Sequence, residues 1–229
     1  MSPSISLNQN EIAYLSNILQ MIDCQNWQAF QSTILNNPKF FQAFSHKISQ
    51  CSELNGMTFL HACVRFNPPA HIVQLIVKLN RESANSVDCL GRTALHIAAG
   101  TRADISTIQI LTEVCPIAVD IQDEDGKTPL HFACDSSCEL FEGDENLQRP
   151  LPCLDSIKIL LSASCMSVAT EDEDGMSPLE YAIMSEADYE VITLLQKATQ
   201  IHYMKRQQVR GMMKRTNHLS HDMVMRLWN

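Results

Sequence analysis

Apolar residues recur along this chain with the spacing of helices that bury one face. Intervals of three and four residues between apolar positions occur in segments 70–79, 104–114, 155–161 and 188–196. Such spacing is typical of amphipathic helices. A shorter apolar run precedes each segment, so the pattern predicts four pairs of helices and an all-α fold.

Each short run follows a turn signal and a helix-start signal. The turn signal is glycine, which adopts a positive φ without strain. The four glycines, spaced by 35, 35 and 49 residues, are Gly56, Gly91, Gly126 and Gly175. Thr93, Thr128 and Ser177 stand two residues later in three of the copies, where a hydroxyl caps the first helical turn. Pro129 and Pro178 follow at the first helical position, which needs no N–H.

The four glycines begin segments that read GMTFLHAC, GRTALHIA, GKTPLHFA and GMSPLEYA. These segments resemble the T-P-L-H-x-A signature of ankyrin repeats, whose period is about 33 residues. The third copy matches the signature fully, and the fourth departs from it at Ser177 and Glu180. The resemblance covers residues 51–200 and implies an all-α ankyrin-repeat solenoid, in which helix-turn-helix units stack and finger loops project between them.

Apolar spacing upstream of the repeats predicts further helices over residues 11–22, 27–35 and 38–48. We interpret residues 1–50 as an N-terminal helical cap, because the end units of a solenoid need an atypical, more polar outer face. Residues 51–200 hold the four ankyrin-like repeats. Residues 201–229 form a basic tail that we expect to be helical.

The third repeat is longer than the others, because residues 136–151 are inserted between its two helices. The insertion is acidic and contains Gly and Pro, a composition typical of a solvated surface loop. A spacer and a contact element both remain open as its role. Since loop closure depends weakly on length, we expect a short Gly-Ser link to replace it without loss of cooperative melting. A lost melt would indicate packing through Leu140 and Phe141.

Charge is divided unevenly along the chain. Residues 197–229 hold seven Lys or Arg residues against Asp222 alone, a net charge of +6 that leaves −15 for the remainder of a chain at −9. Basic helices with apolar stripes are typical of calmodulin targets and membrane-surface elements. The candidate tail-binding residues are Lys205, Arg206, Arg210, Lys214 and Arg215. A helix packed on the last repeat, calmodulin-like binding, nuclear import, and contact with nucleic acid or a membrane all remain open for this tail.

The histidines do not form a catalytic set. His61, His96 and His131 occupy the same position in three repeats, whereas a catalytic triad needs different residues that converge on one site. The chain carries no phosphate-loop, kinase or dinucleotide-binding motif. The acidic loops before Gly126 and Gly175 lack calcium ligands at the first and last positions of an EF-hand loop. We therefore expect no enzyme activity, no cofactor and no small-molecule substrate.

Nine cysteines are spread along the chain, mostly within apolar patterns. Without an export signal, they are typical of reduced thiols that serve as small core residues. A zinc set is conceivable for His131, Cys134, Cys138 and Cys153. The repeat resemblance implies instead that His131 braces neighbouring turns by hydrogen bonds, so we expect no metal. A cytoplasmic or nuclear location follows from the reduced thiols.

The ankyrin resemblance implies partner binding through finger tips and the concave face of the first helices. Carried onto this chain, these positions are Cys89, Leu90, Arg92, Glu124, Asp125, Lys127, Glu173, Asp174 and Met176. Two of the three fingers are acidic, which favours a protein partner with a basic patch over nucleic acid or membrane.

The expected function is therefore a non-catalytic protein–protein interaction module, a scaffold or adaptor. The alternative is a regulatory subunit whose basic C-terminal helix binds its own acidic surface or a calmodulin-like partner.

Overall fold

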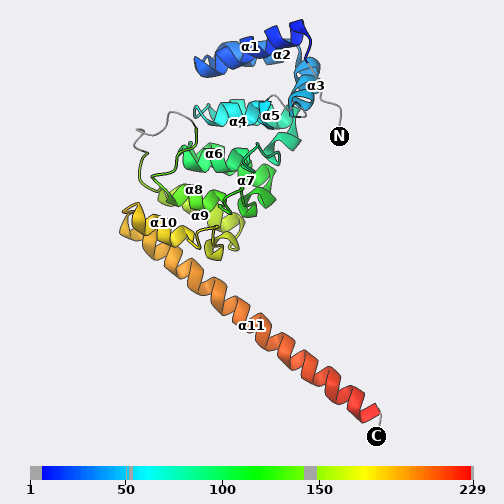
Figure 1. Cartoon of the computed structure of the whole chain (residues 1–229), viewed down its shortest axis with the longest axis vertical. Coiled ribbons are helices and arrows are strands. Elements are labelled where there is room, and N and C mark those ends of the chain that lie inside the picture. The colour runs from blue at the N-terminus through cyan, green and yellow to red at the C-terminus, as the bar shows by residue number, and fades with distance from the viewer. Residues whose placement is uncertain (1–6, 50, 52–53, 142–148, 228–229) are drawn as a thin grey trace.

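The computed structural model describes residues 7–49, 51, 54–141 and 149–227, with side chains as far as Val209. Within these residues every regular segment is helical, apart from one isolated β-bridge between Val87 and Thr93. Helix pairs stack along one axis, and one long helix extends from the end of the stack (Figure 1). The predicted all-α solenoid is confirmed.

Each repeat contributes a first and a second helix. The first helices are α4 (Phe59–Val64), α6 (Ala94–Gly100), α8 (Pro129–Cys134) and α10 (Pro178–Met184). The second helices are α5 (Ala70–Leu79), α7 (Ile105–Val114), α9 (Leu154–Ala163) and the start of α11 (Tyr189–Leu227). Short 3-10 helices follow three of the second helices, namely η2 (Arg81–Ala84), η3 (Pro116–Asp120) and η4 (Ser167–Ala169). First helices pack side by side in one layer and second helices in another.

Three helices precede the repeats, as the apolar spacing predicts. They are α1 (Gln9–Asp23), α2 (Trp27–Asn36) and α3 (Pro38–Ser49). Their apolar side chains continue the core of the repeats, because the rings of Phe41 and Phe59 stack with centroids 5.1 Å apart. Aromatic pairs of this kind join α3 to the first helix of the first repeat.

All four first helices begin with a capping box. The hydroxyl of the N-cap residue accepts a hydrogen bond from the third helical residue, whose side chain accepts one from the N-cap N–H. Histidine Nδ1 provides the returning acceptor in three repeats, as at His96, 3.0 Å from the N–H of Thr93. The carboxylate of Glu180 takes that place in the fourth repeat, 2.6 Å from the N–H of Ser177.

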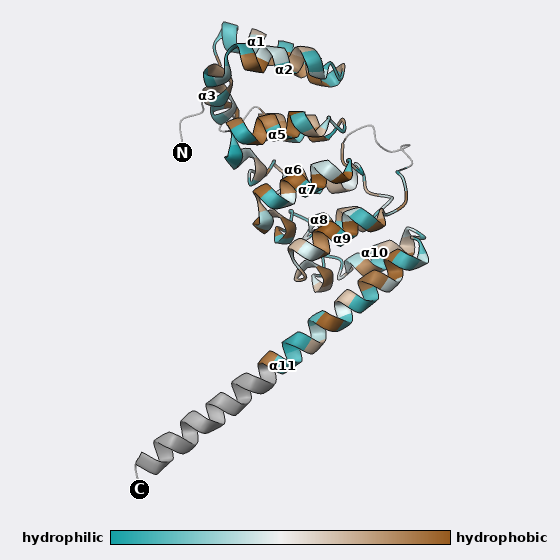
Figure 2. Ribbon diagram, turned by 180° about the vertical axis from the view of Figure 1, so that it is seen from behind, coloured by the Kyte–Doolittle hydropathy of each residue, from teal (hydrophilic) through white to brown (hydrophobic). Residues whose placement is uncertain are grey.

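The predicted turns are confirmed, since Gly91, Gly126 and Gly175 have φ values of 74°, 79° and 75°. The motif leucine lies in the core in the first three repeats, at 0% exposure for Leu60 and Leu130 and 1% for Leu95. The repeat motif predicts a buried leucine in the fourth repeat as well, and this prediction was wrong, because Leu179 packs at the edge of the core and is only half-buried. Figure 2 shows hydrophobic residues concentrated on helices such as α5 and α7.

The second helix of the fourth repeat does not end near residue 196. Helix α11 continues without interruption from Tyr189 to Leu227, so the last repeat and the basic tail share one helix. No Gly or Pro occurs between residues 189 and 210 to end it, and a helix stops most readily at such residues. Figure 1 shows this helix extending away from the stack.

The connection between α8 and α9 differs from the expected solvated loop. Leu140 is only 3% exposed and belongs to the core, and Phe141 is half-buried against it. The polar composition of the segment concealed this packing, because a single apolar pair has no periodicity that marks a buried face. The described part of the insertion is therefore docked on the repeats.

Candidate functional site

Three finger loops, named the second, third and fourth fingers after the repeats that they precede, share one internal design. An aspartate begins each tip, and its Oδ1 atom accepts hydrogen bonds from the backbone N–H groups two and four residues later. In the third finger, Asp123 accepts them from Asp125 at 3.1 Å and Lys127 at 2.8 Å. Asp88 and Asp172 repeat these contacts in the other two fingers. These three carboxylates hold the turns together, and part of the acidic charge is therefore structural.

Backbone hydrogen bonds also join each finger to the preceding turn. The N–H of Glu124 donates to the carbonyl of Leu90 at 2.9 Å, and the N–H of Glu173 donates to that of Asp125 at 2.9 Å. The glycines permit this approach, since a Cβ atom at Gly91 would lie 3.1 Å from the backbone nitrogen of Glu124. The fingers form a continuous edge whose tips are held at a fixed spacing.

The motif histidines join each repeat to the next finger. Nδ1 of His96 accepts from Thr93, so Nε2 carries the proton and donates to the carbonyls of Ile121 and Lys127 at 3.1 and 3.2 Å. His61 and His131 make the equivalent contacts with the carbonyls of Arg92 and Met176. The bracing role implied by the resemblance is thus present in three repeats.

Burial keeps these histidines neutral. It lowers the pKa of His96 to about 3 and that of His131 to about 4, and it lowers the pKa of His61 as well. Both ring nitrogens of each histidine are engaged in hydrogen bonds, which leaves neither lone pair nor proton for catalysis or for a metal.

Five of the nine predicted partner-binding residues meet at one pocket of about 140 Å³ between the second and third fingers. The five are Leu90, Arg92, Glu124, Asp125 and Lys127. Asp123, Phe132 of α8 and the first part of the insertion, at Cys138 and Glu139, complete the lining. The pocket therefore lies where fingers, first helices and insertion come together.

The exposure of the predicted residues divides them into three groups. The exposed ones are Cys89, Leu90, Glu124, Asp125, Glu173 and Asp174. Lys127 and Met176 are half-buried, and Arg92 is buried at 8% exposure. The fourth repeat's finger, with Glu173, Asp174 and Met176, does not contribute to the pocket.

Arg92 is committed to contacts within the chain. Its Nη2 atom lies 2.7 Å from Oδ2 of Asp88, and both side chains are almost fully buried. Burial by itself raises the pKa of Asp88, but the hydrogen bonds and charge of Arg92 outweigh it and hold the pKa below its usual value. Asp88 therefore stays ionised, and it holds the guanidinium of Arg92 in a fixed orientation.

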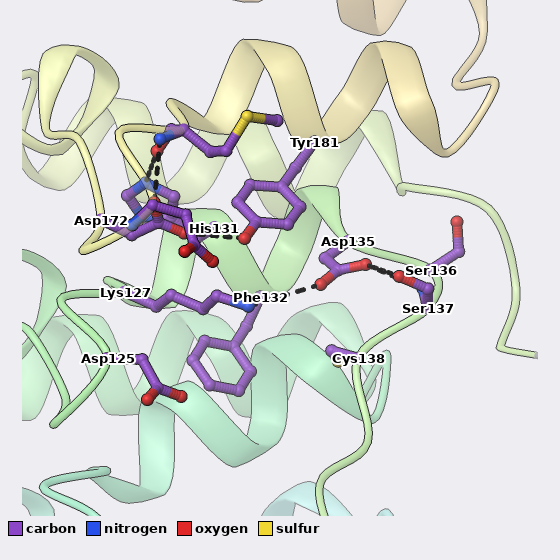
Figure 3. Close-up of polar contacts among 12 residues, drawn as sticks. Asp125, Lys127, His131, Phe132, Asp135, Ser136, Ser137, Cys138, Asp172 and Tyr181 are labelled. Carbon is purple, nitrogen blue, oxygen red and sulfur yellow. Dashed lines mark hydrogen bonds and ion pairs between the residues drawn. The ribbon is translucent and has the colours of Figure 1, made fainter. Parts of the chain in front are cut away.

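Lys127 is the second cation in the pocket lining, and Figure 3 shows it among side chains of the third and fourth repeats. Its ammonium lies 4.7 Å from the ring centroid of Tyr181 and 3.9 Å from Oδ2 of Asp135. The Tyr181 hydroxyl donates to Asp172 at 2.7 Å. Burial lowers the pKa of Lys127, but Tyr181, Asp135 and Asp172 together raise it by more than burial lowers it. The net shift of the pKa is upward, so the side chain stays charged.

The insertion covers part of the first-helix layer beside this pocket. The carbonyl of Leu140 accepts a hydrogen bond from Nη1 of Arg92 at 2.7 Å, and the Phe141 ring lies against Arg65. The sequence contained a signal for this, namely an adjacent Leu-Phe pair within an otherwise acidic segment. Residues Leu140, Phe141 and Arg65 therefore belong to the candidate site although they were not among the predicted binding residues.

The tail residues lie apart from the fingers. Lys205 and Arg206 are exposed and line a separate pocket of about 460 Å³ with Cys165 and Met166. Neither forms an ion pair with any residue whose side chain is described. The side chains of Arg210, Lys214 and Arg215 are outside the described residues, so their predicted binding role stays a prediction.

All nine cysteines are free thiols, and four of them are buried. Burial raises the pKa of Cys134 to about 12 and also raises that of Cys138, so both thiols stay protonated. In the described part of the chain, no three His, Cys, Asp or Glu side chains gather as a metal site would require. Over the same residues, no helix has both the length and the apolar character to span a membrane.

Comparison with known protein families finds ankyrin repeats in this chain. Residues 60–143 match the family model described as ankyrin repeats, in three copies. The matched segment begins within α4 and ends just after Phe141, so it includes the second and third fingers and the pocket between them. Ankyrin repeats generally mediate protein–protein interactions and are typically not catalytic.

Proposed function

This chain is an ankyrin-repeat protein, and on that premise we propose that it is a scaffold or adaptor that binds a protein partner. The contact surface consists of the second and third fingers and the adjoining first helices. The observation that carries the proposal is the convergence of five finger residues on one pocket. Rigid fingers favour recognition, because a preorganised surface loses little conformational entropy on binding.

The electrostatics of the pocket support a partner with a basic patch. Glu124 and Asp125 are exposed at the tip of the third finger, and Glu139 is an exposed residue of the pocket lining. Arg92 and Lys127 are each engaged with carboxylates of the chain, so the charge presented to a partner is negative. Complementary charge of this kind raises association rates and fixes the orientation of a partner.

We place this function in the cytoplasm or the nucleus, where free thiols persist. The nine free cysteines support that location. Nucleic acid would be repelled by the exposed carboxylates of the fingers, which supports protein over nucleic acid as the partner.

A charge-reversal experiment tests the proposal. The variant Glu124→Lys/Asp125→Lys changes two exposed finger carboxylates, and the matched control Glu113→Lys/Asp120→Lys makes the same change in net charge at exposed positions of α7 and η3. Proteins retained by the wild-type chain in affinity capture would be purified and their dissociation constants measured for all three chains.

We expect the finger variant to weaken binding about tenfold or more and the control to leave it nearly unchanged. The loss should shrink as salt concentration rises, because exposed charges are screened. Binding that survives finger reversal, or that both variants weaken equally, would reject the fingers as the contact surface.

A further inference from the structure

The insertion places an apolar side chain deep in the first-helix layer. Leu140 is 3% exposed, and the space it fills exists because residue 100 is glycine. A Cβ atom at Gly100 would lie 2.9 Å from Cδ1 of Leu140 and 3.1 Å from the ring of Phe132. Gly100 is the last residue of α6, so a bare stretch of helix backbone forms the floor of a side-chain pocket.

The backbone of the insertion is also recognised. Nη1 of Arg92 donates to the carbonyl of Leu140 at 2.7 Å. Asp88 fixes the guanidinium from the other side, with Nε 2.9 Å from Oδ2. A charged donor held in advance of binding recognises a carbonyl of any residue, whichever side chain that residue carries.

The next residue of the insertion lies against a second cation. The guanidinium carbon of Arg65 is 3.9 Å from the ring centroid of Phe141, and that of Arg92 is 5.6 Å away. Arg65 caps the end of α4 and is otherwise exposed. Arginine over an aromatic face is a cation–π contact, which favours an aromatic over an aliphatic side chain at this position.

Further hydrogen bonds hold the rest of the described insertion in place. Nε of Arg149 donates to the carbonyl of Cys138 at 2.8 Å, and Nε of Arg102 donates to that of Pro150 at 3.2 Å. Residues 138–141 thus follow the first-helix layer from the third repeat toward the first. They use one aliphatic pocket, one backbone acceptor and one aromatic position, a combination that a peptide ligand would use.

We propose that the surface formed by Arg65, Arg92, Gly100 and Phe132 is a binding groove for an extended protein segment with adjacent aliphatic and aromatic side chains. Residues 138–141 occupy this groove as an intramolecular ligand, and the partner segment displaces them. This inference rests on the proposed function, because it identifies what the first-helix face recognises. The finger carboxylates contact the partner beside the groove, and the groove decides which segment of the partner enters.

A peptide in trans tests the groove directly. The probe is a fluorescein-labelled peptide with the sequence of residues 136–145 and Cys138→Ser, titrated with full-length protein and followed by fluorescence anisotropy. The two proteins compared are the wild type and the variant Leu140→Ala/Phe141→Ala, which removes the intramolecular occupant's side chains. Circular dichroism and urea unfolding establish that the variant is folded.

We expect the variant to bind the probe about tenfold or more tightly than the wild type does, because a tethered competitor acts at high effective concentration. Adding Arg65→Ala to the variant should weaken binding several-fold, and a probe with both Leu140→Ala and Phe141→Ala should not bind. Equal affinity for the two proteins, or no binding to the folded variant, overturns the proposal and leaves the insertion as a fixed structural element.

The single variant Phe141→Ala covers the case in which the double variant does not fold. Phe141 is half-buried while Leu140 is in the core, so the single change vacates the Arg65 position and keeps the buried leucine. It should still bind the probe more tightly than the wild type, and equal binding overturns the proposal. Because the probe assay does not involve Glu124 or Asp125, its failure leaves the finger charge-reversal result standing as a separate test of the proposed function.

Discussion

The third and fourth repeats carry similar start motifs in different surroundings. In the third repeat Leu130 is fully buried, and a Cβ atom at Gly126 would lie 3.1 Å from the backbone nitrogen of Glu173. In the fourth repeat Leu179 is half-buried, and a Cβ atom at Gly175 would meet no described atom within 4 Å. The motif thus sets the turn and the helix start of its own repeat, whereas the burial of the motif comes from the repeat that follows.

The largest difference is expected for the two leucines. Leu130→Ala should lower the free energy of unfolding by roughly 2–5 kcal/mol, because it leaves a cavity in packed surroundings. Leu179→Ala should cost about 1 kcal/mol, since less apolar surface leaves the core and the site can collapse. Urea unfolding followed by circular dichroism measures both. Equal losses would show that the fourth repeat is packed as tightly as the third.

The glycines give a smaller but sharper contrast. Gly126→Ala and Gly175→Ala both place a Cβ atom at positive φ, which costs about 1–2 kcal/mol in either repeat. Only at Gly126 does the added atom also press on the backbone of the next finger, 3.2 Å from the Cα atom of Asp172. We expect Gly126→Ala to lower the melting temperature by more than Gly175→Ala does. Identical shifts would mean that the finger moves aside at negligible cost.

The sequence was sufficient to predict the features that residues close together in the chain determine. Glycine, a hydroxyl residue and proline at the start of Pro129–Cys134 act within one turn of the chain, so this helix and its turn could be predicted. The half-exposure of Leu179 depends on what packs over it, and local spacing carries no information about that. The burial of Leu140 depends on Gly100, which lies 40 residues earlier in the chain.

The same division applies to the candidate site. The finger positions could be assigned from the repeat register, and five of them meet at one pocket. The exposure of these residues could not be predicted from the repeat register. Arg92 has the sequence position of a surface residue, yet the insertion and Asp88 bury it. The acidic count of the fingers was also misleading, since Asp88, Asp123 and Asp172 hold their own turns.

The smallest expected effect is a difference in how stability depends on pH. It distinguishes the third repeat, where a histidine accepts the hydrogen bond from the N-cap N–H, from the fourth repeat, where a glutamate accepts it. Burial lowers the pKa of His131 from 6.5 to about 4. In the unfolded chain His131 therefore binds a proton near pH 6.5, whereas in the folded chain it stays neutral at that pH. The free energy of unfolding consequently falls as the pH drops from about 7 toward 4. Hydrogen bonds from Ser177 lower the pKa of Glu180 below 4.5. Its contribution is complete above that value and is lost only at lower pH.

Between pH 7 and pH 6 His96 and His131 should thus each cost about 0.7 kcal/mol of stability, and Glu180 nothing. The variant His131→Glu copies the cap of the fourth repeat into the third. It should be less stable at pH 7, because a carboxylate cannot donate to the carbonyl of Met176, which His131 Nε2 contacts at 3.2 Å. It should also lose less stability than the wild type between pH 7 and pH 6, by about 0.7 kcal/mol. Urea midpoints at the two pH values measure both effects, with Glu180→Gln as the matched control whose pH dependence should equal that of the wild type. A wild-type chain equally stable at pH 7 and pH 6 would show that the histidines take up protons in the folded state and that the brace between repeats survives their charging.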